Sequence, residues 1–306
     1  MKKAYKHSVT EFMEVIMTLI EAIIMGIVQG IAEFLPISSS GHLAIFKHVL
    51  GVKTDTGMMF DIMLHFGTLV AIFIAFWKDI KELVVGGFSI IGRFFYNLYV
   101  FVIKVTKKDV EYKKIIKTDY DRFVMLIIVS TIPTGLAGVL LGDIFESIGE
   151  SLLFTGMFLI LTAVLLFIAD RCKVGNTTMK DASYKKAGII GVAQAIAISP
   201  GLSRSGTTIT ACLLCGFTKE FAVKYSFLMS IPAVLGAVVL DIPDLLSSGI
   251  ETSLLTNYAI GTIVSCVVGY ICIVTMLKIV RNKKFFGFTI YCAVVGTIAI
   301  VANFLV

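Results

Sequence analysis

The sequence predicts an all-α polytopic membrane protein, a single integral membrane domain over residues 1–306 with six transmembrane helices and two re-entrant helix-loop-helix hairpins. Hydrophobic residues make up 57% of the chain and charged residues only 16%, whereas soluble domains carry about a quarter charged residues. The mean hydropathy is accordingly +0.93. Apolar runs of membrane-spanning length recur along the chain, and two further apolar regions are interrupted by Pro, Gly and Ser.

Six nearly uncharged segments are long enough to cross a hydrocarbon core of about 30 Å. They are residues 61–77, 123–141, 152–169, 221–240, 258–277 and 286–305. Lys and Arg number ten in 78–122, five in 170–186 and four in 278–285, but none in 143–151 or 241–255. Because basic loops stay on the cytoplasmic side, we expect the loops at 143–151 and 241–255 to lie outside.

Regions 15–50 and 187–217 are apolar but broken in the middle by clusters of Pro, Gly and Ser, so we interpret each as a re-entrant hairpin. Residues 83–118 form an insertion whose apolar part contains Arg93 and lies in a strongly basic stretch. We predict an interfacial helix there. If this helix crosses the membrane instead, the protein has seven spans.

An internal repeat relates the two broken regions. Gly26-Ile-Val-Gln-Gly-Ile-Ala32 matches Gly191-Val-Ala-Gln-Ala-Ile-Ala197 at an offset of 165 residues. The repeat predicts a duplication, with repeat 1 at about 21–170 and repeat 2 at about 187–306. Each half holds one hairpin and three spans, and because three is odd, the second half is inverted in the membrane. This arrangement places the N-terminal lysines outside, against the usual charge bias.

Composition narrows the class of protein further. The six cysteines lie within or beside apolar runs, which indicates reduced thiols packed as small hydrophobes. Glu11, Glu14 and Glu21 interrupt the first apolar stretch, so no cleaved signal peptide is predicted. The net charge of +6 suits loops facing anionic lipid headgroups, so we expect membrane lipids and no nucleic acid as partners. The sequence leaves a homodimer open.

Candidate functional residues gather in the first hairpin, Gln29-Gly-Ile-Ala-Glu33-Phe-Leu-Pro-Ile-Ser38-Ser39-Ser40-Gly41-His42. Gln29 and Glu33 are four residues apart and therefore share a helix face. An ionisable side chain at membrane depth costs about 2.5–3.5 kcal/mol on insertion scales, so Glu33 and His42 are candidate functional residues. The alternative is a structural pair that holds the hairpin closed.

The second hairpin reads Ser199-Pro200-Gly201-Leu202-Ser203-Arg204-Ser205-Gly206-Thr207-Thr208. Pro and Gly end one half-helix, and the next begins with hydroxyls, free backbone N–H groups and one guanidinium. A helix N-terminus offers oriented donors and Arg204 adds a planar fork, so this segment suits a phosphate. The repeat directs a second helix N-terminus, near Ser39, toward the same place, which predicts an anionic ligand. A purely structural pair of Arg204 with Glu33 is the alternative.

Asp61 and His65 form another polar pair, four residues apart at the start of a predicted span. Either side chain could face a cavity between the hairpins. Polar residues are also common near a membrane interface, so the sequence leaves both interpretations open.

These residues carry a specific resemblance to a known family. Gln29 and Glu33 with Pro36-Ile-Ser-Ser-Ser-Gly-His42, and Pro200-Gly-Leu-Ser-Arg-Ser-Gly-Thr-Thr208, resemble the two signature motifs of the undecaprenyl-diphosphate phosphatases, or bacitracin-resistance proteins. The resemblance implies hydrolysis of undecaprenyl diphosphate to undecaprenyl phosphate and phosphate. That reaction recycles the lipid carrier of peptidoglycan synthesis at the bacterial plasma (inner) membrane and confers resistance to bacitracin.

The motifs and the chemistry of the residues together assign roles. The expected catalytic residues are Glu33, Ser39, His42 and Arg204. The expected substrate-binding residues are Gln29, Ser203, Ser205, Gly206 and Thr208. The resemblance implies a divalent cation, Mg or Ca. Glu33, aided by Gln29, would bind this metal ion or orient His42. Arg204 would offset charge on the transferring phosphoryl group, and His42 or Ser39 would attack or activate the attacking group, at a site open to the outer face.

Two other classes of protein compete with this interpretation. A lipid flippase or secondary transporter of an anionic substrate is one, because inverted repeats with broken helices are typical of transporters. A lipid phosphatase of acid-phosphatase type is the other, but its motif requires a His where Thr210 follows Arg204. Phosphate release by the purified protein distinguishes a hydrolase from a transporter.

Overall fold

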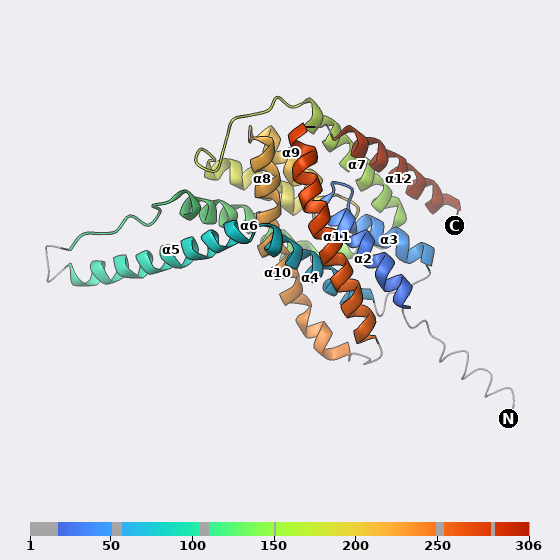
Figure 1. The fold of residues 1–306 in the computed structure, drawn as a ribbon, viewed down its shortest axis with the longest axis horizontal. Helices are drawn as coiled ribbons and strands as arrows, with labels where there is room; N and C mark the ends of the chain where they lie inside the picture. The colour runs from blue at the N-terminus through green and yellow to red at the C-terminus, as the bar shows by residue number, and fades with distance from the viewer. Residues whose placement is uncertain are drawn as a thin grey trace.

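The computed structural model describes residues 18–50, 57–104, 110–149, 151–248, 254–282 and 285–305. In these ranges the regular structure is helical apart from one isolated β-bridge, which confirms the all-α class. The helices, labelled as in Figure 1, are α2 (Leu19–Phe34), α3 (Ser39–Leu50), α4 (Gly57–Ala75), α5 (Trp77–Ile103), α6 (Asp119–Gly149), α7 (Leu152–Arg171), α8 (Tyr184–Ile196), α9 (Arg204–Leu214), α10 (Lys219–Ser248), α11 (Leu255–Asn282) and α12 (Phe286–Leu305).

Six of the described helices are long and apolar enough to cross a membrane, so the protein is a multi-pass membrane protein. Five of them, α6, α7, α10, α11 and α12, contain predicted spans. The sixth is α5, whereas the predicted span at 61–77 falls largely in the shorter α4. With 19 residues, α4 is still about 28 Å long at a rise of 1.5 Å per residue, close to the thickness of the hydrocarbon core.

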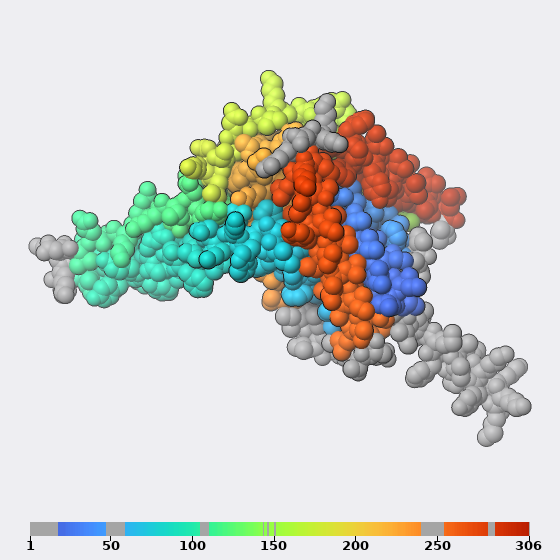
Figure 2. All heavy atoms as spheres, viewed as in Figure 1, coloured from blue at the N-terminus to red at the C-terminus, as the bar shows by residue number. Residues whose placement is uncertain are grey.

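Helix α5 begins two residues after α4 ends and leaves the helix bundle as an arm (Figures 1 and 2). Its Arg93 side chain points toward the returning chain and donates hydrogen bonds of 2.9 and 3.0 Å to Asp121. Its exposed positions between 84 and 102 hold only Val, Ile, Leu, Phe, Tyr and Gly. The interfacial location of 83–118 stays a prediction, and so does the alternative of a seventh span; residues 105–109 lie outside the described ranges.

The two broken regions form helix-loop-helix hairpins, α2 with α3 and α8 with α9, and each packs on a long helix of the other half. Helix α2 packs against α11, and α8 packs against α6. A methyl group added at Gly26 would lie 2.6 Å from the carbonyl oxygen of Gly261, and one at Gly191 would lie 2.4 Å from that of Ser130. Small residues permit such close backbone packing in membranes, and Gly26 and Gly191 are equivalent in the repeat.

Helices α7 and α12 meet in a reciprocal contact. A methyl group added at Gly156 would lie 2.7 Å from the carbonyl oxygen of Gly296, and one at Gly296 would lie 2.8 Å from that of Gly156. Each half therefore contacts the other in a similar way: α2 packs on α11 as α8 packs on α6, and α7 and α12 pack on each other. The repeat boundaries and the inverted orientation stay predictions, and Lys2, Lys3 and Lys6 lie outside the described residues.

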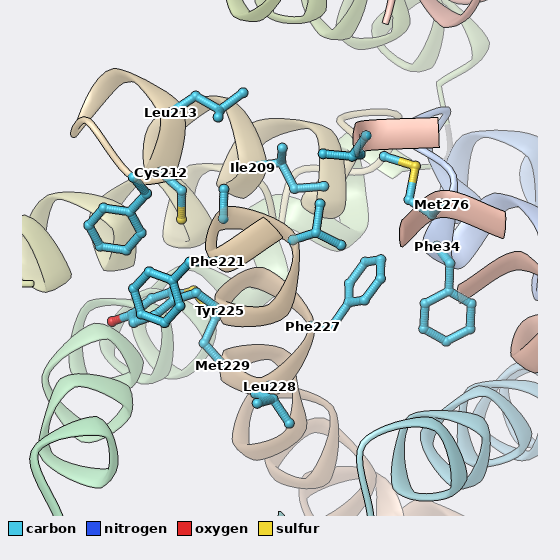
Figure 3. Packing of buried hydrophobic residues seen from close by; sticks show 14 of the residues in the cluster. Phe34, Ile209, Cys212, Leu213, Phe221, Tyr225, Phe227, Leu228, Met229 and Met276 are labelled. Atoms are coloured by element: carbon cyan, nitrogen blue, oxygen red, sulfur yellow. The ribbon is translucent and has the colours of Figure 1, made fainter. Parts of the chain in front are cut away.

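Aromatic side chains pack around α10, between the two halves (Figure 3). The ring of Phe227 meets that of Phe34 edge-on, with centroids 5.4 Å apart, in the geometry that aromatic pairs prefer. Because Phe34 follows Glu33 in the chain, this packing fixes the end of α2 at which the candidate site lies. All six cysteines are free.

Candidate active site at the hairpin tips

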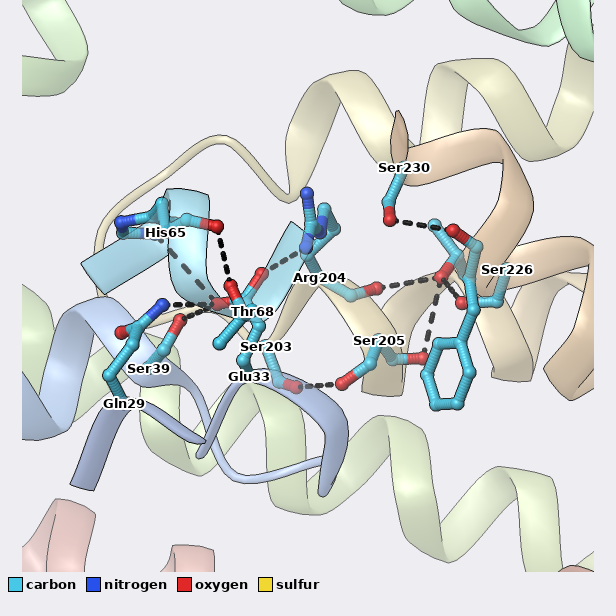
Figure 4. A network of polar contacts seen from close by, with 12 residues as sticks. Gln29, Glu33, Ser39, His65, Thr68, Ser203, Arg204, Ser205, Ser226 and Ser230 are labelled. Carbon is cyan, nitrogen blue, oxygen red and sulfur yellow. Dashed lines mark hydrogen bonds and ion pairs between the residues drawn. The ribbon is translucent and has the colours of Figure 1, made fainter. Parts of the chain in front are cut away.

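Glu33 lies in the last turn of α2, and both of its carboxylate oxygens are engaged (Figure 4). Oε2 accepts hydrogen bonds from Gln29 Nε2 at 3.0 Å and from Ser39 Oγ at 2.7 Å. Oε1 accepts a hydrogen bond from the guanidinium of Arg204. Four of the candidate residues therefore meet around one buried carboxylate, and they come from both hairpins.

A capping box fixes the start of α2, the helix that carries Gln29 and Glu33. Thr18 and Glu21 form a capping box, in which Thr18 Oγ1 accepts from the backbone N–H of Glu21 and the Glu21 carboxylate accepts from that of Thr18. Glu21 therefore serves the helix end rather than the site. Gln29 and Glu33 follow on one face of the helix, and both are buried.

Arg204 forms an ion pair with Glu33, which is the contact that the structural alternative predicted, and this pair joins the two hairpins electrostatically. The Glu33 side chain is 5% exposed and that of Arg204 is 24% exposed. Leaving one partner of a buried pair without the other costs about 3–5 kcal/mol, so this contact favours one arrangement of the hairpins. A guanidinium carries five N–H donors, and because one nitrogen of Arg204 contacts Glu33, others can bind an anion.

His65 of α4 reaches the same carboxylate. Its Nε2 lies 3.8 Å from Glu33 Oε2, and its side chain is 33% exposed. Its Nδ1 lies 2.8 Å from the backbone carbonyl oxygen of Asp61. Because a carbonyl can only accept, Nδ1 carries a proton and Nε2 is the ring atom that faces Glu33. The structure thus brings His65 to the site, while Asp61 orients its ring through the backbone.

The loops of the two hairpins touch. The backbone N–H of Gly201 donates to Ser40 Oγ at 3.2 Å, and Ser205 Oγ donates to the carbonyl of Leu35 at 3.4 Å. Gly201 has a φ of +89°, and an added methyl group would lie 2.6 Å from the carbonyl oxygen of Thr155 in α7. Only glycine suits this backbone and this space. The N-terminal ends of α3 and α9 therefore lie next to each other.

Both helices that begin at the tips are capped in the same way. Ser203 Oγ accepts from the backbone N–H of Gly206 at 3.1 Å, and Ser38 Oγ accepts from that of Gly41 at 3.2 Å. These pairs are separated by the 165-residue offset of the repeat. Such caps satisfy one backbone donor and leave the first N–H groups of each helix directed toward the tips.

Thr208 faces away from the carboxylate. Its hydroxyl donates to the backbone carbonyl of Arg204 at 2.8 Å and lies 2.6 Å from Ser226 Oγ of α10. Like Ser203, Ser205 and Gly206, Thr208 is buried. Ser203 caps α9 and the other three lie in its first two turns; the substrate-binding role of all four stays a prediction.

His42 makes its hydrogen bonds to other groups than Glu33. Its Nδ1 lies 2.7 Å from the carbonyl oxygen of Ser38, and its Nε2 lies 2.7 Å from the hydroxyl of Tyr291 in α12. Ser38 has a φ of +73°, a conformation that a non-glycine residue adopts only when its surroundings impose it. His42 therefore belongs to a second cluster, one helical turn along α3 from Ser39, and its catalytic role stays a prediction.

Sequence reasoning did not identify two of these partners. Tyr291 and Ser226 lie in apolar runs that predict only membrane spans. The signal available was a hydroxyl inside such a run, which needs a hydrogen-bond partner in a non-aqueous environment. That signal gives no indication of which partner it meets, because His42 is 249 residues away from Tyr291.

The cation ligands expected at Glu33 and Gln29 can be tested against the geometry. Among the described residues there is no group of three or more His, Cys, Asp or Glu side chains that could hold a metal ion. Gln29 Nε2 donates to Glu33, whereas Gln29 Oε1 is buried and has no hydrogen-bond partner. Carboxylate and amide oxygens are ligands for Mg and Ca, and Mg completes its shell with phosphate oxygens and water. These two donor types suit such a cation, and its binding at Glu33 and Gln29 stays a prediction.

Fold and site together define a class of membrane protein. Its members cross the membrane several times, and two paired hairpins place a buried carboxylate against a guanidinium at two helix N-termini. Residues 22–298 match the family described as bacitracin resistance protein BacA. The chain belongs to this family.

Relatives with known names cover nearly the whole chain. The protein named undecaprenyl-diphosphatase in Methanosphaera stadtmanae is 42% identical over 93% of this chain and 98% of its own length. Its namesake in Alkaliphilus metalliredigens is 40% identical over 94% of this chain and 100% of its own length. A third, in Halothermothrix orenii, is 38% identical over 93% of this chain and 98% of its own length.

Proposed function

We propose that this protein is an undecaprenyl-diphosphatase, which hydrolyses undecaprenyl diphosphate to undecaprenyl phosphate and phosphate. The observation that carries the proposal is the meeting of the two hairpin tips, because it brings the N-terminal ends of α3 and α9 together beside the guanidinium of Arg204. Membership of the bacitracin-resistance family and the names of the relatives support it. The reaction would recycle the lipid carrier of peptidoglycan synthesis and so confer resistance to bacitracin.

The diphosphate would bind to Arg204 and to the first backbone N–H groups of α3 and α9. A guanidinium holds two phosphate oxygens in its planar fork, and a helix N-terminus adds oriented donors. Both groups stabilise the charge that spreads over the transferring phosphoryl group, which is the main task in this type of reaction. Glu33 balances the charge of Arg204 until the anion arrives.

Ser39 and His42 would supply the groups that react with the phosphoryl group. The hydroxyl of Ser39 donates its proton to Glu33, so its oxygen lone pairs point away from the carboxylate. The neutral ring of His42 has its lone pair on Nε2, because Nδ1 donates to Ser38. Each residue offers an atom that can attack phosphorus or accept a proton from attacking water.

We further propose that a divalent cation, Mg or Ca, accompanies the diphosphate. Glu33 and the unpartnered Gln29 Oε1 would hold it on the protein side. When bound, the cation would neutralise charge on the phosphate oxygens. Chelation is expected to lower phosphate release, and added Mg is expected to restore it.

The site is proposed to open to the outer face of the plasma membrane. The support is the charge pattern, since Lys and Arg are absent from the loops at 143–151 and 241–255 and abundant in the intervening ones. The polyprenyl chain of the substrate would stay among the membrane lipids while its diphosphate reaches Arg204, whose side chain is partly exposed.

Phosphate release by the purified protein in detergent, with undecaprenyl diphosphate as substrate, tests the proposal. We expect turnover by the wild-type protein and a severe loss in Arg204→Lys. A lipid flippase or secondary transporter would release no phosphate. A folded wild-type protein that releases none would therefore overturn the proposed activity.

A further inference from the structure

Tyr291 covers His42 in the structure. The rings of the two residues stack with an interplanar angle of 9° and centroids 5.5 Å apart. The Tyr291 hydroxyl lies 2.7 Å from His42 Nε2. His42 is 5% exposed, whereas Tyr291 retains partial contact with the surroundings. The ring of Tyr291 therefore separates the imidazole from the outside.

The hydrogen bonds fix the tautomer of His42. The carbonyl of Ser38 can only accept, so Nδ1 carries a proton. In the neutral ring Nε2 then has a lone pair, and the Tyr291 hydroxyl donates to it. Two hydrogen bonds and a stacked ring thus hold the imidazole in one rotamer, with Nε2 directed at a single hydroxyl.

This arrangement exists in the first hairpin and not in its repeat equivalent. Thr207 occupies the position that matches His42, and its buried hydroxyl has no hydrogen-bond partner. Ser203, which matches Ser38, has an ordinary φ of −68° where Ser38 has +73°. Of the two hairpins, the strained backbone therefore occurs in the one that carries the imidazole, although the carbonyls of Ser38 and Ser203 both accept the backbone N–H four residues later. Strain of this kind persists where it serves a particular geometry.

We propose that Tyr291 is a positioning residue for His42 in the phosphoryl transfer. Its hydroxyl keeps the neutral Nδ1–H tautomer and presents Nε2 at the place where a reacting oxygen would replace the hydroxyl. Its ring prevents the imidazole from rotating away from that place. The inference rests on the proposed diphosphatase activity, since it assigns a task to His42 in that reaction.

Tyr291→Phe tests this role, because it removes the hydroxyl and keeps the ring. Tyr270→Phe on α11 is the matched control, since Tyr270 is 41% exposed and Tyr291 is 43% exposed. Removal of one neutral hydrogen bond predicts a fall in kcat of about 3- to 10-fold in Tyr291→Phe, with KM nearly unchanged. The control should keep the wild-type kcat.

A double-mutant cycle separates positioning from a general structural effect. If Tyr291 acts through His42, Tyr291→Phe has no further effect on the residual turnover of His42→Ala. An equal fold loss in both backgrounds would show that Tyr291 serves the fold and would overturn the proposal. A kcat of Tyr291→Phe equal to that of the wild type would overturn it as well.

Two measurements do not depend on turnover. Diethyl pyrocarbonate should modify His42 faster in Tyr291→Phe than in the wild type, because Nε2 loses its partner. Nitrogen NMR of the wild-type protein should show the Nδ1–H tautomer at His42, and an Nε2–H tautomer would contradict the assignment. If the wild type releases no phosphate while these two results hold, the proposed activity fails and the Tyr291–His42 contact stands.

Discussion

Replacing Arg204 by Lys is the sharpest test of the site, because it keeps the positive charge and removes the planar guanidinium group. One nitrogen of Arg204 contacts Glu33, and the rest of the guanidinium is available to an anion. A lysine ammonium has three donors on one nitrogen, so it can contact Glu33 and a phosphate but lacks the planar fork that holds two phosphate oxygens. Glu33 keeps its hydrogen bonds from Gln29 and Ser39, so the variant should fold.

The expected loss follows from the kind of interaction removed. Deleting one preorganised donor that stabilises developing charge costs about 2.7–4 kcal/mol, or about 10²–10³ in rate. Because lysine retains the positive charge, we expect the lower end, a fall in kcat of about 10²-fold. Arg204→Ala should also destabilise the fold by about 3–5 kcal/mol, since it leaves Glu33 as an unpaired buried charge.

The assay is phosphate release from undecaprenyl diphosphate in detergent, with thermal stability measured on the same samples. Arg171→Lys is the matched control, since Arg171 lies at the end of α7 against Phe167. Turnover near the wild-type level in Arg204→Lys would refute the reasoning. Full additivity of Arg204→Ala with Glu33→Ala would also refute it, because residues that act as a unit are not additive.

Three further predictions concern packing and topology. Gly191→Ala should lower thermal stability by about 1–3 kcal/mol, because its methyl group would meet a carbonyl oxygen at 2.4 Å, whereas Gly188→Ala on the same helix meets nothing within 4 Å and should be tolerated. In a cysteine-free background, Ser147→Cys should react with an impermeant thiol reagent in intact cells and Lys113→Cys should not; the opposite pattern would reverse the orientation. Ile90→Cys should be labelled from the same side as Lys113→Cys, and labelling from opposite sides would show that α5 spans.

Periodicity and apolar length were sufficient to predict the helical class and five of the spans, because a bilayer dictates how long a spanning helix must be. The end of α4 was predicted to within two residues, because charged residues begin at Lys78. The start of α5 directly afterwards was not predictable in the same way. It depends on the local backbone at Phe76, with φ −113° and ψ 25°, for which hydropathy carries no signal.

At the site, helical spacing was enough to pair Gln29 with Glu33, and the structure shows that hydrogen bond directly. Spacing could not show where the His42 ring points, because its partners are a strained carbonyl nearby and a hydroxyl on the last helix. For the same reason, spacing could not show whether the His65 side chain faces a cavity between the hairpins. Side-chain direction across helices depends on tertiary packing, which a local pattern does not contain.

The Glu33–Arg204 pair also has a consequence for the order in which the protein is made. The two residues are 171 positions apart, so the ribosome completes the first half of the chain well before it reaches the guanidinium. During that interval the first hairpin carries an acidic group at membrane depth without its counter-charge, an expensive state in hydrocarbon. The early hairpin should therefore wait in a hydrated or protonated form and settle only when the second hairpin is inserted. Synthesis of the second hairpin would then complete the folding of the first.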